Sequence, residues 1–308
     1  MEKFFSWFSN LYLFLRFVLN DAGKEYGVGR LRKWRLGRKI IKNNRQVKSL
    51  SSWQQHLLMA EEILLLPESL KGDVIECGCF NGASTVNLSW ACALTHRRLF
   101  VCDSFAGLSQ PDQEEKYEVL SDLNSYYVYK KGDYSSDGGL EGVKQNVAQY
   151  GRPEVCRFVK GYFNETLKDL ETDKIAMVFE DADLASSVKD CLIHLWPKLQ
   201  EGCKFYCHEP FSVNVVAVFY NQQWWQENFK TECPGFYGSG KGINYAFNHS
   251  TLGYAWKVDP ERVKQSQRQL KVRFRQRQDG SWKAVAGLKK KAKEAQAQSD
   301  NKSLIYES

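Results

Sequence analysis

The stretch "GDVIECGCFNGASTVNLSW", residues 72–90, joins a short apolar run to a helix-forming run through a loop rich in small residues. Glu76 lies at the end of the apolar run, and Gly78 and Gly82 lie four positions apart in the loop. Glycine permits a tight turn and lets a ligand approach the backbone closely. In open parallel sheets, ligands bind beyond the carboxyl ends of the strands. We therefore predict a ligand-binding loop between a strand and a helix.

The alternation of strand and helix patterns continues downstream of this loop. Four further short apolar runs follow: "RLFVCDSF", "CRFVKGYF", "KIAMVFEDADL" and "CKFYCHEP". Short continuous apolar runs are typical of parallel strands that are covered on both faces. Their alternation with helical patterns predicts a doubly wound α/β domain with a mainly parallel sheet. The polar, tyrosine-rich segment 109–137 interrupts one crossover, and we expect it to form a lid or a binding loop.

The loop after the first strand lacks the GxGxxG pattern of dinucleotide-binding folds. An acid before the glycines suits a cationic ligand better than a pyrophosphate, and S-adenosylmethionine carries an amino group and a sulfonium but no phosphate. Asp103 ends the second strand, where an acid can bind ribose hydroxyls. The expected cofactor-binding residues are Glu76, Gly78, Gly82, Ser84, Asp103 and Ser104.

Polar side chains also end the fourth and fifth strands. Asp181 and Asp183 follow the fourth strand, and His208 and Glu209 follow the fifth. Carboxylate and imidazole groups of this kind can hold a divalent cation, or they can act as a general base toward a hydroxyl. Asp183 alternatively caps the helix that follows it. The residues alone leave these alternatives open.

The chain resembles the macrocin O-methyltransferase family in four motifs that occur in order within residues 49–215: "VIECGCFNGAST", "VCDSFAGL", "VKGYFNETL" and "FEDADLASSVKDCLIHLWPKLQEG". The resemblance implies a seven-stranded class I methyltransferase sheet, Rossmann-like in topology, with S-adenosylmethionine as cofactor and typically a magnesium ion. It also implies O-methylation of a hydroxyl on a small-molecule acceptor, such as a polyketide, a macrolide or a sugar.

This chain departs from the family pattern at the end of the fifth strand. Where the family usually has two aspartates, the chain has His208 and Glu209. By position, the resemblance places the metal ligands at Asp181, His208 and Glu209. Because Mg²⁺ prefers oxygen ligands, His208 favours another divalent cation or no metal at all. In the second case His208 is itself a candidate base, so the expected catalytic residues are His208 and Asp181.

The net charge of +7 is unevenly distributed along the chain. Residues 24–48 carry +9 and residues 254–308 carry +8, which leaves −10 on residues 49–253. A nucleic-acid-binding domain would present a basic stripe on its folded body, so this distribution argues against nucleic acid as a partner. We expect a helical arm and basic linker in residues 1–48, the methyltransferase domain in residues 49–285, and a basic, disordered tail in residues 286–308.

The N-terminal segment is apolar and aromatic, but its uncharged run from Phe4 to Leu15 is shorter than the roughly 20 residues that span a bilayer. An apolar helix beside a basic segment predicts peripheral contact with a membrane, the seam of a homo-oligomer, or ordinary packing on its own domain. The nine cysteines form no CxxC pair and indicate buried, reduced thiols in a cytoplasmic protein.

Two other functions remain open at this point. A nicotinamide-dependent oxidoreductase could use a similar sheet, although the missing GxGxxG pattern argues against it. A non-catalytic scaffold at a membrane could use the aromatic arm and the basic linker while it still binds the cofactor. Titration with each cofactor would separate the oxidoreductase from the methyltransferase, and turnover on a hydroxyl would exclude the scaffold.

Overall fold

The structure is a computed structural model, which describes residues 2–112, 117–119, 122–240, 242–243, 252–258, 270–276 and 282–288. Side chains are described in residues 9–112, 128–240, 242–243 and 252–258. The chain divides into two compact units, Met1–Lys257 and Val258–Ser308. The first unit contains all of the candidate site residues.

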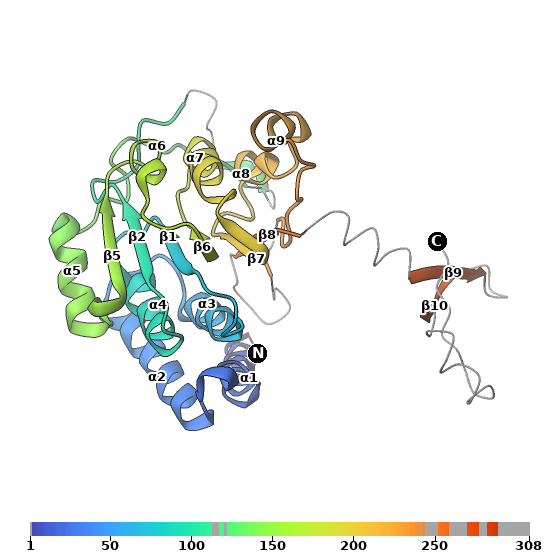
Figure 1. Ribbon diagram of the computed structural model, residues 1–308, viewed down its shortest axis with the longest axis horizontal. Coiled ribbons are helices and arrows are strands. Elements are labelled where there is room, and N and C mark those ends of the chain that lie inside the picture. Colours follow the sequence, from blue (N-terminus) through green and yellow to red (C-terminus); the bar gives the residue numbers. More distant parts are fainter. Residues whose placement is uncertain are drawn as a thin grey trace. The chain divides into compact units, whose positions relative to one another are not determined.

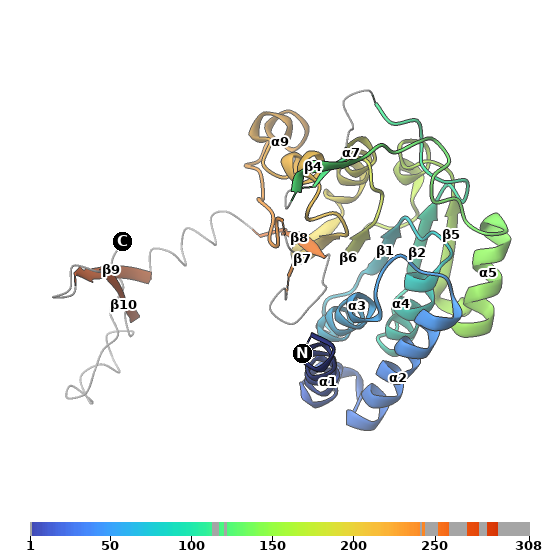
Figure 2. The same cartoon turned by 180° about the vertical axis from the view of Figure 1, so that it is seen from behind.

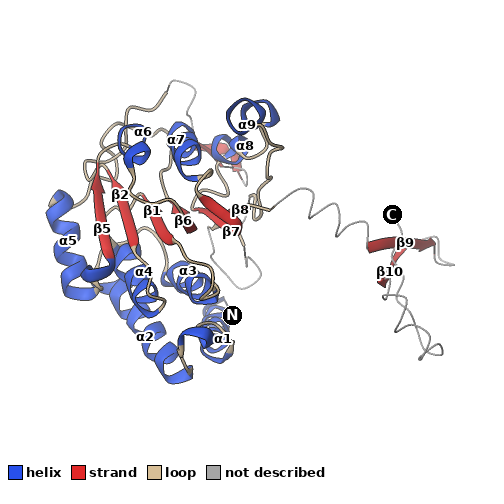
Figure 3. Cartoon of the chain, viewed as in Figure 1, coloured by secondary structure: helices blue, strands red, loops and turns tan. Residues whose placement is uncertain are grey.

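A six-stranded sheet forms the centre of the first unit, with the strand order β5-β2-β1-β6-β7-β8. Five strands pair in parallel, and β8 pairs antiparallel with β7 at one edge (Figure 3). The strands are β1 (Asp73–Cys77), β2 (Leu99–Asp103), β5 (Cys156–Lys160), β6 (Ile175–Glu180), β7 (Leu199–Cys207) and β8 (Gly253–Trp256). The five predicted strands and the mainly parallel sheet are confirmed. The described residues contribute six strands to this sheet, and the seventh strand stays a prediction.

Helices cover both faces of the sheet, because successive side chains along each strand enter opposite cores. Val74 of β1 packs with one core and Ile75 with the other. Figures 1 and 2 show α3 and α4 on one face of the sheet and α7 on the other. The helices of the first core are α1 (Glu2–Leu19), α2 (Arg30–Gln46), α3 (Trp53–Leu65), α4 (Ala83–Leu94) and α5 (Gly139–Tyr150). Those of the second core are α7 (Ala185–Leu195), α8 (Val213–Val218) and α9 (Gln222–Phe229), and the short α6 (Phe163–Thr166) lies beside α7.

The first two helices pack against the body of the domain. Phe17 of α1 and Ile40 of α2 are fully buried in the same core as Met59 of α3. The ammonium group of Lys33 is also buried, and it donates to the backbone carbonyl and side-chain oxygen of Asn20. The helical arm and basic linker expected in residues 1–48 thus contain α1 and α2, and the domain boundaries at residues 48 and 285 stay predictions. Among the described residues, no helix is both long and apolar enough to cross a membrane.

Two small antiparallel pairs complete the described structure. Within the predicted lid segment, β3 (Tyr117–Val119) pairs with β4 (Asp122–Tyr127). In the second unit, β9 (Leu270–Gln276) pairs with β10 (Trp282–Leu288), and Gln276 lies opposite Trp282. The sequence "KVRFRQRQDGSWKAV" predicts a hairpin with its turn at Asp279-Gly280; the antiparallel pairing of its two strands is confirmed, and the turn lies outside the described residues. The tail expected in residues 286–308 lies outside the described residues from residue 289 onward.

Candidate active site

The strand order reverses between β1 and β6, and the loops that leave these two strands meet at the same edge of the sheet. Gly78 follows β1 with a φ of +84°, and a Cβ added there would lie 2.0 Å from the backbone oxygen of Asp181. Gly82 has a φ of +81° and begins α4 as its N-cap. Because a side chain at Gly78 would meet the neighbouring loop, packing between the two loops accounts for this glycine.

Asp103 connects the loop after β1 to the loop after β2. Its Oδ2 accepts a hydrogen bond from the backbone N–H of Cys79 at 2.7 Å, and its Oδ1 accepts one from Phe105 at 2.6 Å. Burial raises the pKa of this carboxyl, and the backbone donors act in the opposite direction. Each carboxylate oxygen keeps a further lone pair, so the group can still accept from a ligand hydroxyl.

A cavity of about 390 Å³ opens at this edge of the sheet. Its wall includes seven of the residues that the sequence proposed for cofactor binding, catalysis or a metal: Gly78, Ser84, Asp103, Ser104, Asp181, His208 and Glu209. Gly82 and Glu76 do not line it. Glu76 is fully buried and accepts a hydrogen bond from the Thr85 hydroxyl at 2.6 Å. Burial raises the pKa of Glu76 to about 8, so its direct contact with a cofactor stays a prediction.

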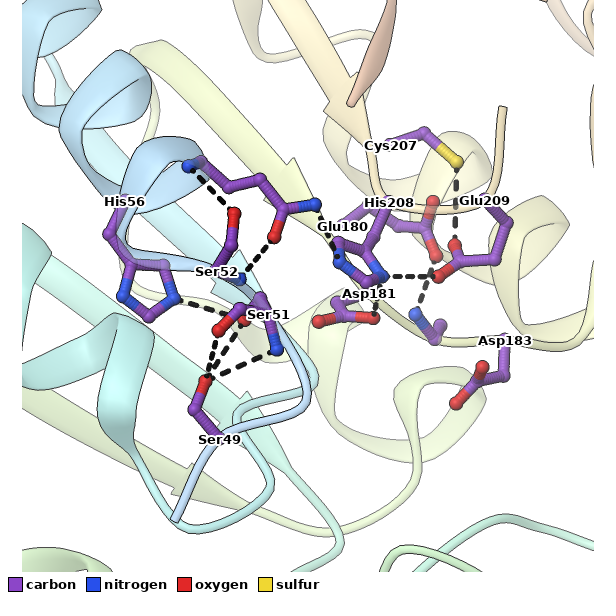
Figure 4. A network of polar contacts seen from close by, with 12 residues as sticks. Ser49, Ser51, Ser52, His56, Glu180, Asp181, Asp183, Cys207, His208 and Glu209 are labelled. Atoms are coloured by element: carbon purple, nitrogen blue, oxygen red, sulfur yellow. Dashed lines mark hydrogen bonds and ion pairs between the residues drawn. The ribbon is translucent and has the colours of Figure 1, made fainter. Parts of the chain in front are cut away.

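Three polar residues of the cavity wall meet where β6 and β7 end. The Nδ1 of His208 lies 3.1 Å from Asp181 Oδ1 and 3.2 Å from Glu209 Oε1 (Figure 4). The side chain of Glu209 is 2 % exposed, whereas that of Asp181 is 27 % exposed. The loops after β6 and β7 hold this arrangement, because the backbone N–H of His208 donates to the carbonyl of Glu180 at 2.9 Å. We call Asp181, His208 and Glu209 the acidic–imidazole cluster.

The acidic–imidazole cluster also has a partner on α3. The side-chain nitrogen of Gln55 lies 3.2 Å from the Nε2 of His208. The next residue, His56, is fully buried, with its ring nitrogens 3.0 Å from the Ser51 hydroxyl and 2.9 Å from the Asn87 amide nitrogen. Burial lowers the pKa of His56 to about 3, so this ring is neutral at physiological pH. The first turn of α3 therefore contacts the cluster through Gln55, and His56 anchors that turn to Ser51 and Asn87.

Asp183 is a further carboxyl in the cavity wall. The Tyr129 hydroxyl donates to its Oδ1 at 2.8 Å. Burial, reinforced by the charge of Asp181, raises the pKa of Asp183 to about 7. The alternative role of Asp183 as a helix cap is wrong, because α7 has Leu184 as its N-cap and no side chain caps it. Asp183 instead adopts a left-handed conformation, with a φ of +62°, that directs the chain from β6 into α7.

The acidic–imidazole cluster offers the donor atoms of a divalent-cation site. One ligand atom from each of Asp181, His208 and Glu209 lies within 4.8 Å of the others, and two carboxylates with one imidazole form a donor set used by transition metals. Coordination requires a ring nitrogen without a proton. The Nδ1 of His208 faces both carboxylates at 3.1 and 3.2 Å, a spacing that fits a protonated Nδ1 as well as three ligand atoms around one cation, so these distances alone do not decide between the two.

Sequence reasoning missed two residues of the site, and each carries a different signal. Tyr129 lies within the tyrosine-rich segment that we expected to form a lid or a binding loop. The sequence therefore indicated that this segment borders the site, but it did not indicate the hydrogen bond from Tyr129 to Asp183. Gln55 belongs to the pattern Ser-x-x-Gln, which is the signature of a helix capping box. That pattern predicts the start of α3 but gives no indication of His208.

A doubly wound sheet with a glycine loop after β1, an acid after β2 and a polar cavity at the switch point defines a class I methyltransferase fold. The chain belongs to the macrocin O-methyltransferase family, whose profile matches residues 54–222, more than half of its length. This confirms the resemblance seen in the four motifs. The solved structure of the O-methyltransferase NovP has the same fold, with a TM-score of 0.53 and 17 % identity over 82 % of this chain and 100 % of that one.

Curated relatives share the central part of the chain. An 8-demethyl-8-(2,3-dimethoxy-alpha-L-rhamnosyl)-tetracenomycin-C 4'-O-methyltransferase of Streptomyces olivaceus is 31 % identical over 147 residues, which are 45 % of this chain and 52 % of that protein. A mycinamicin III 3''-O-methyltransferase of Micromonospora griseorubida is 25 % identical over 141 residues, 44 % of this chain and 54 % of that protein. The chain spans about half the length of the curated relatives it matches.

Proposed function

We propose that the protein is an S-adenosylmethionine-dependent O-methyltransferase that acts on a hydroxyl of a sugar or polyketide natural product. One observation carries the proposal: a single cavity joins the loop around Gly78 and Asp103 to the acidic–imidazole cluster. The first part suits the cofactor and the second suits a hydroxyl that must lose its proton. Membership of the macrocin O-methyltransferase family supports this assignment over a nicotinamide-dependent oxidoreductase.

The proposed mechanism needs orientation and a proton acceptor. When bound, S-adenosylmethionine supplies an electrophilic methyl group. The cavity would hold the acceptor hydroxyl beside the bound cofactor, and proximity can account for a large part of the barrier reduction. Transfer of that methyl group would release S-adenosylhomocysteine, and the hydroxyl proton would pass to Asp181, the more exposed carboxylate of the cluster. His208 lies against Asp181 and fixes its orientation.

Asp183 is the competing proton acceptor. Its pKa of about 7 lies near the pH at which a general base works best. Its hydrogen bond from Tyr129 ties it to the loop that borders the cavity. Asp181→Asn and Asp183→Asn therefore distinguish the two, because only the variant that lacks the true acceptor loses turnover while it still binds the cofactor.

The cavity wall supports a ring-shaped acceptor. Aromatic side chains form a substantial part of it: Phe80, Tyr129, Tyr134, Tyr162, Phe163 and Phe211. Such side chains pack against the apolar faces of sugar rings and of flat polyketides. The relative from Streptomyces olivaceus is named for a rhamnosyl tetracenomycin, which combines both. The −10 charge of residues 49–253 disfavours an anionic acceptor.

The test is cofactor binding followed by turnover. Calorimetry on the full chain should give binding of S-adenosylmethionine and none of NADH or NADPH. A panel of a rhamnosylated polyketide, its aglycone and a free sugar should then give S-adenosylhomocysteine with at least one acceptor. Cofactor binding without turnover on any hydroxyl would favour the scaffold, and the absence of cofactor binding would reject the proposed function.

We also propose a cytoplasmic protein that contacts an anionic membrane through α1 and α2. One side of α1 exposes the large apolar residues Leu11, Tyr12, Leu15 and Leu19. Exposed residues of α2 include the apolar Leu31 and Trp34 and the basic Arg30, Arg32, Arg35 and Arg38. Apolar groups beside exposed cations suit an anionic bilayer surface. Lys33, which the sequence placed among these cations, is buried against Asn20 and cannot contribute.

A further inference from the structure

The orientation of the Gln55 side chain is fixed by its own helix. Gln55 and Ser52 form a capping box at the start of α3. The backbone N–H of Ser52 donates to the Oε1 of Gln55 at 2.5 Å, and the backbone N–H of Gln55 donates to the Ser52 hydroxyl at 3.4 Å. A backbone N–H can only donate, so the atom of Gln55 that faces Ser52 is the carbonyl oxygen. The NH₂ group of Gln55 therefore points the other way, toward His208.

This orientation determines which nitrogen of His208 carries the proton. The side-chain nitrogen of Gln55 lies 3.2 Å from the Nε2 of His208. An amide NH₂ group donates and does not accept, so in the neutral ring of His208 the Nε2 is the acceptor and carries no proton. In a neutral imidazole the other nitrogen then carries the proton.

The opposite side of the ring is arranged for the same tautomer. The Nδ1 of His208 faces Asp181 Oδ1 at 3.1 Å and Glu209 Oε1 at 3.2 Å. Both oxygens belong to carboxyl groups, which accept a hydrogen bond when they are ionised. Burial raises the pKa of Glu209, whereas the neighbouring His208 lowers that of Asp181, so Asp181 is the principal acceptor. The amide of Gln55 on one side of the ring and the carboxyls on the other side thus favour the same tautomer, with the proton of His208 on Nδ1.

We propose that Gln55 is a positioning residue that fixes His208 in the Nδ1–H tautomer and thereby keeps divalent cations off the Nδ1 of this cluster. A cation at Nδ1 would require the proton on Nε2, where it would meet the NH₂ group of Gln55. The amide could accept that proton only by turning over, which would leave the backbone N–H of Ser52 without its acceptor. This conclusion differs from the sequence-based expectation of a metal at Asp181, His208 and Glu209.

For the reaction, this means that hydrogen bonds alone, without a cation, orient the carboxylates of the cluster. Where an ion would orient the carboxylates, the Nδ1–H of His208 does so in this chain. The inference rests on the proposed function only for the catalytic role of the acidic–imidazole cluster. The tautomer of His208 follows from the contacts of Gln55 and does not depend on that role. Its test therefore needs neither cofactor nor acceptor.

The test uses two variants of α3 that carry the same added charge. Gln55→Glu keeps an acceptor oxygen for the backbone N–H of Ser52, since a capping box accepts glutamate as well as glutamine at this position, but it replaces the donor facing His208 with an acceptor. Gln54→Glu adds the same charge one position earlier. In ¹⁵N-histidine spectra of the wild-type protein, recorded at a pH at which His208 is neutral and assigned by loss of signals in His208→Gln, we expect a protonated Nδ1 and an unprotonated Nε2. The Gln54→Glu variant should give the same pattern, and Gln55→Glu should give a protonated Nε2.

Binding of Mn²⁺, measured by electron paramagnetic resonance without cofactor, gives the second readout. Gln55→Glu should bind Mn²⁺ about tenfold or more tightly than both the wild type and Gln54→Glu, the scale by which partners of metal ligands alter affinity. A protonated Nε2 in the wild type would overturn the proposal. So would wild-type Mn²⁺ binding that equals that of Gln55→Glu and disappears in His208→Gln. Failure of the protein to methylate any acceptor would reject the proposed function and leave both readouts intact.

Discussion

Gln55 and His208 lie 153 positions apart in the chain, and their side-chain nitrogens meet at 3.2 Å. One residue belongs to the first turn of α3, and the other follows the last parallel strand. The contact connects the stability of a helix end to the chemistry of the active site, because the same amide that caps α3 also holds the imidazole. Changes at Gln55 should therefore alter proton position and cation binding before they alter the fold.

The first prediction concerns cation dependence. If the tautomer of His208 keeps Nδ1 protonated, activity should survive exhaustive chelation, since the cluster needs no ion to orient Asp181. The measurement is formation of S-adenosylhomocysteine before and after treatment with a chelator. The Gln55→Glu variant serves as the comparison, because its activity should respond to added Mn²⁺. Loss of wild-type activity on chelation, with recovery on adding Mn²⁺ or Mg²⁺, would contradict the prediction.

The second prediction separates Asp103 from Glu76. Asp103→Asn should weaken S-adenosylmethionine binding by about 1–3 kcal/mol, the scale of hydrogen bonds to charged groups. Glu76→Gln should weaken it less, because Glu76 lies outside the cavity wall and accepts from Thr85. Calorimetry measures both affinities. Glu141→Gln, which removes a carboxylate paired with Lys144 outside the cavity, is the matched control and should bind normally. Equal losses in both test variants would give Glu76 the direct role that the sequence proposed.

The strand-end residues could be predicted because the signal is local. Asp103, Asp181 and His208 directly follow short apolar runs, and the carboxyl ends of parallel strands meet at one edge. The partner of His208 could not be predicted, since no pattern in the chain connects a capping glutamine to a strand end. The burial of Lys33 could not be predicted either, because a lysine within a basic run is normally exposed to solvent. Only the packing of the chain around Asn20 buries it.

The third prediction concerns the buried His56. Burial lowers the pKa of this ring to about 3, so the unfolded chain binds a proton near pH 6.5 that the folded chain does not. The free energy of unfolding should therefore fall as pH drops below 6.5, by about 2 kcal/mol at pH 5 from this residue. Urea denaturation of the wild type and His56→Gln at pH 7 and pH 5 isolates that contribution.

The His56→Gln variant should lose less stability between the two pH values than the wild type does. His194→Gln, which changes a histidine of α7 that is only partly buried, is the control and should behave like the wild type. Identical pH dependence in all three proteins would show that His56 takes up its proton in the folded state.

The fourth prediction has the opposite sign and concerns Glu76. Burial raises its pKa to about 8, so the folded chain holds a proton that the unfolded chain releases above about pH 4.5. Its contribution to stability is present below the unfolded pKa and is lost as pH rises through 8. Glu76→Gln, which mimics the protonated form, should be less sensitive to alkali than the wild type. Thermal unfolding at pH 6.5 and pH 9 measures the difference, and parallel losses in both proteins would count against a protonated Glu76.

The last prediction concerns the surface of α1 and α2. Vesicles that contain anionic lipid should pellet the full-length protein at low salt and release it at high salt, because screening weakens the attraction of exposed cations. Replacing the four exposed arginines of α2 by glutamine, Arg30, Arg32, Arg35 and Arg38, should abolish pelleting. Each cation near an anionic surface contributes about 1 kcal/mol to the free energy of membrane binding, so loss of all four should weaken binding by about 4 kcal/mol.

The control for this prediction replaces four exposed cations outside α1 and α2 by glutamine: Arg157, Lys160, Lys168 and Lys174. It changes the net charge equally and should leave pelleting intact if the arginines of α2 form the contact. Loss of pelleting in both variants would indicate attraction by net charge alone. If the wild type ignores vesicles and instead sediments as a dimer that Leu15→Glu converts to a monomer, the exposed side of α1 is a contact between two copies, and the membrane proposal is wrong. Salt separates the outcomes further, because burial of apolar surface between copies does not weaken as charges are screened.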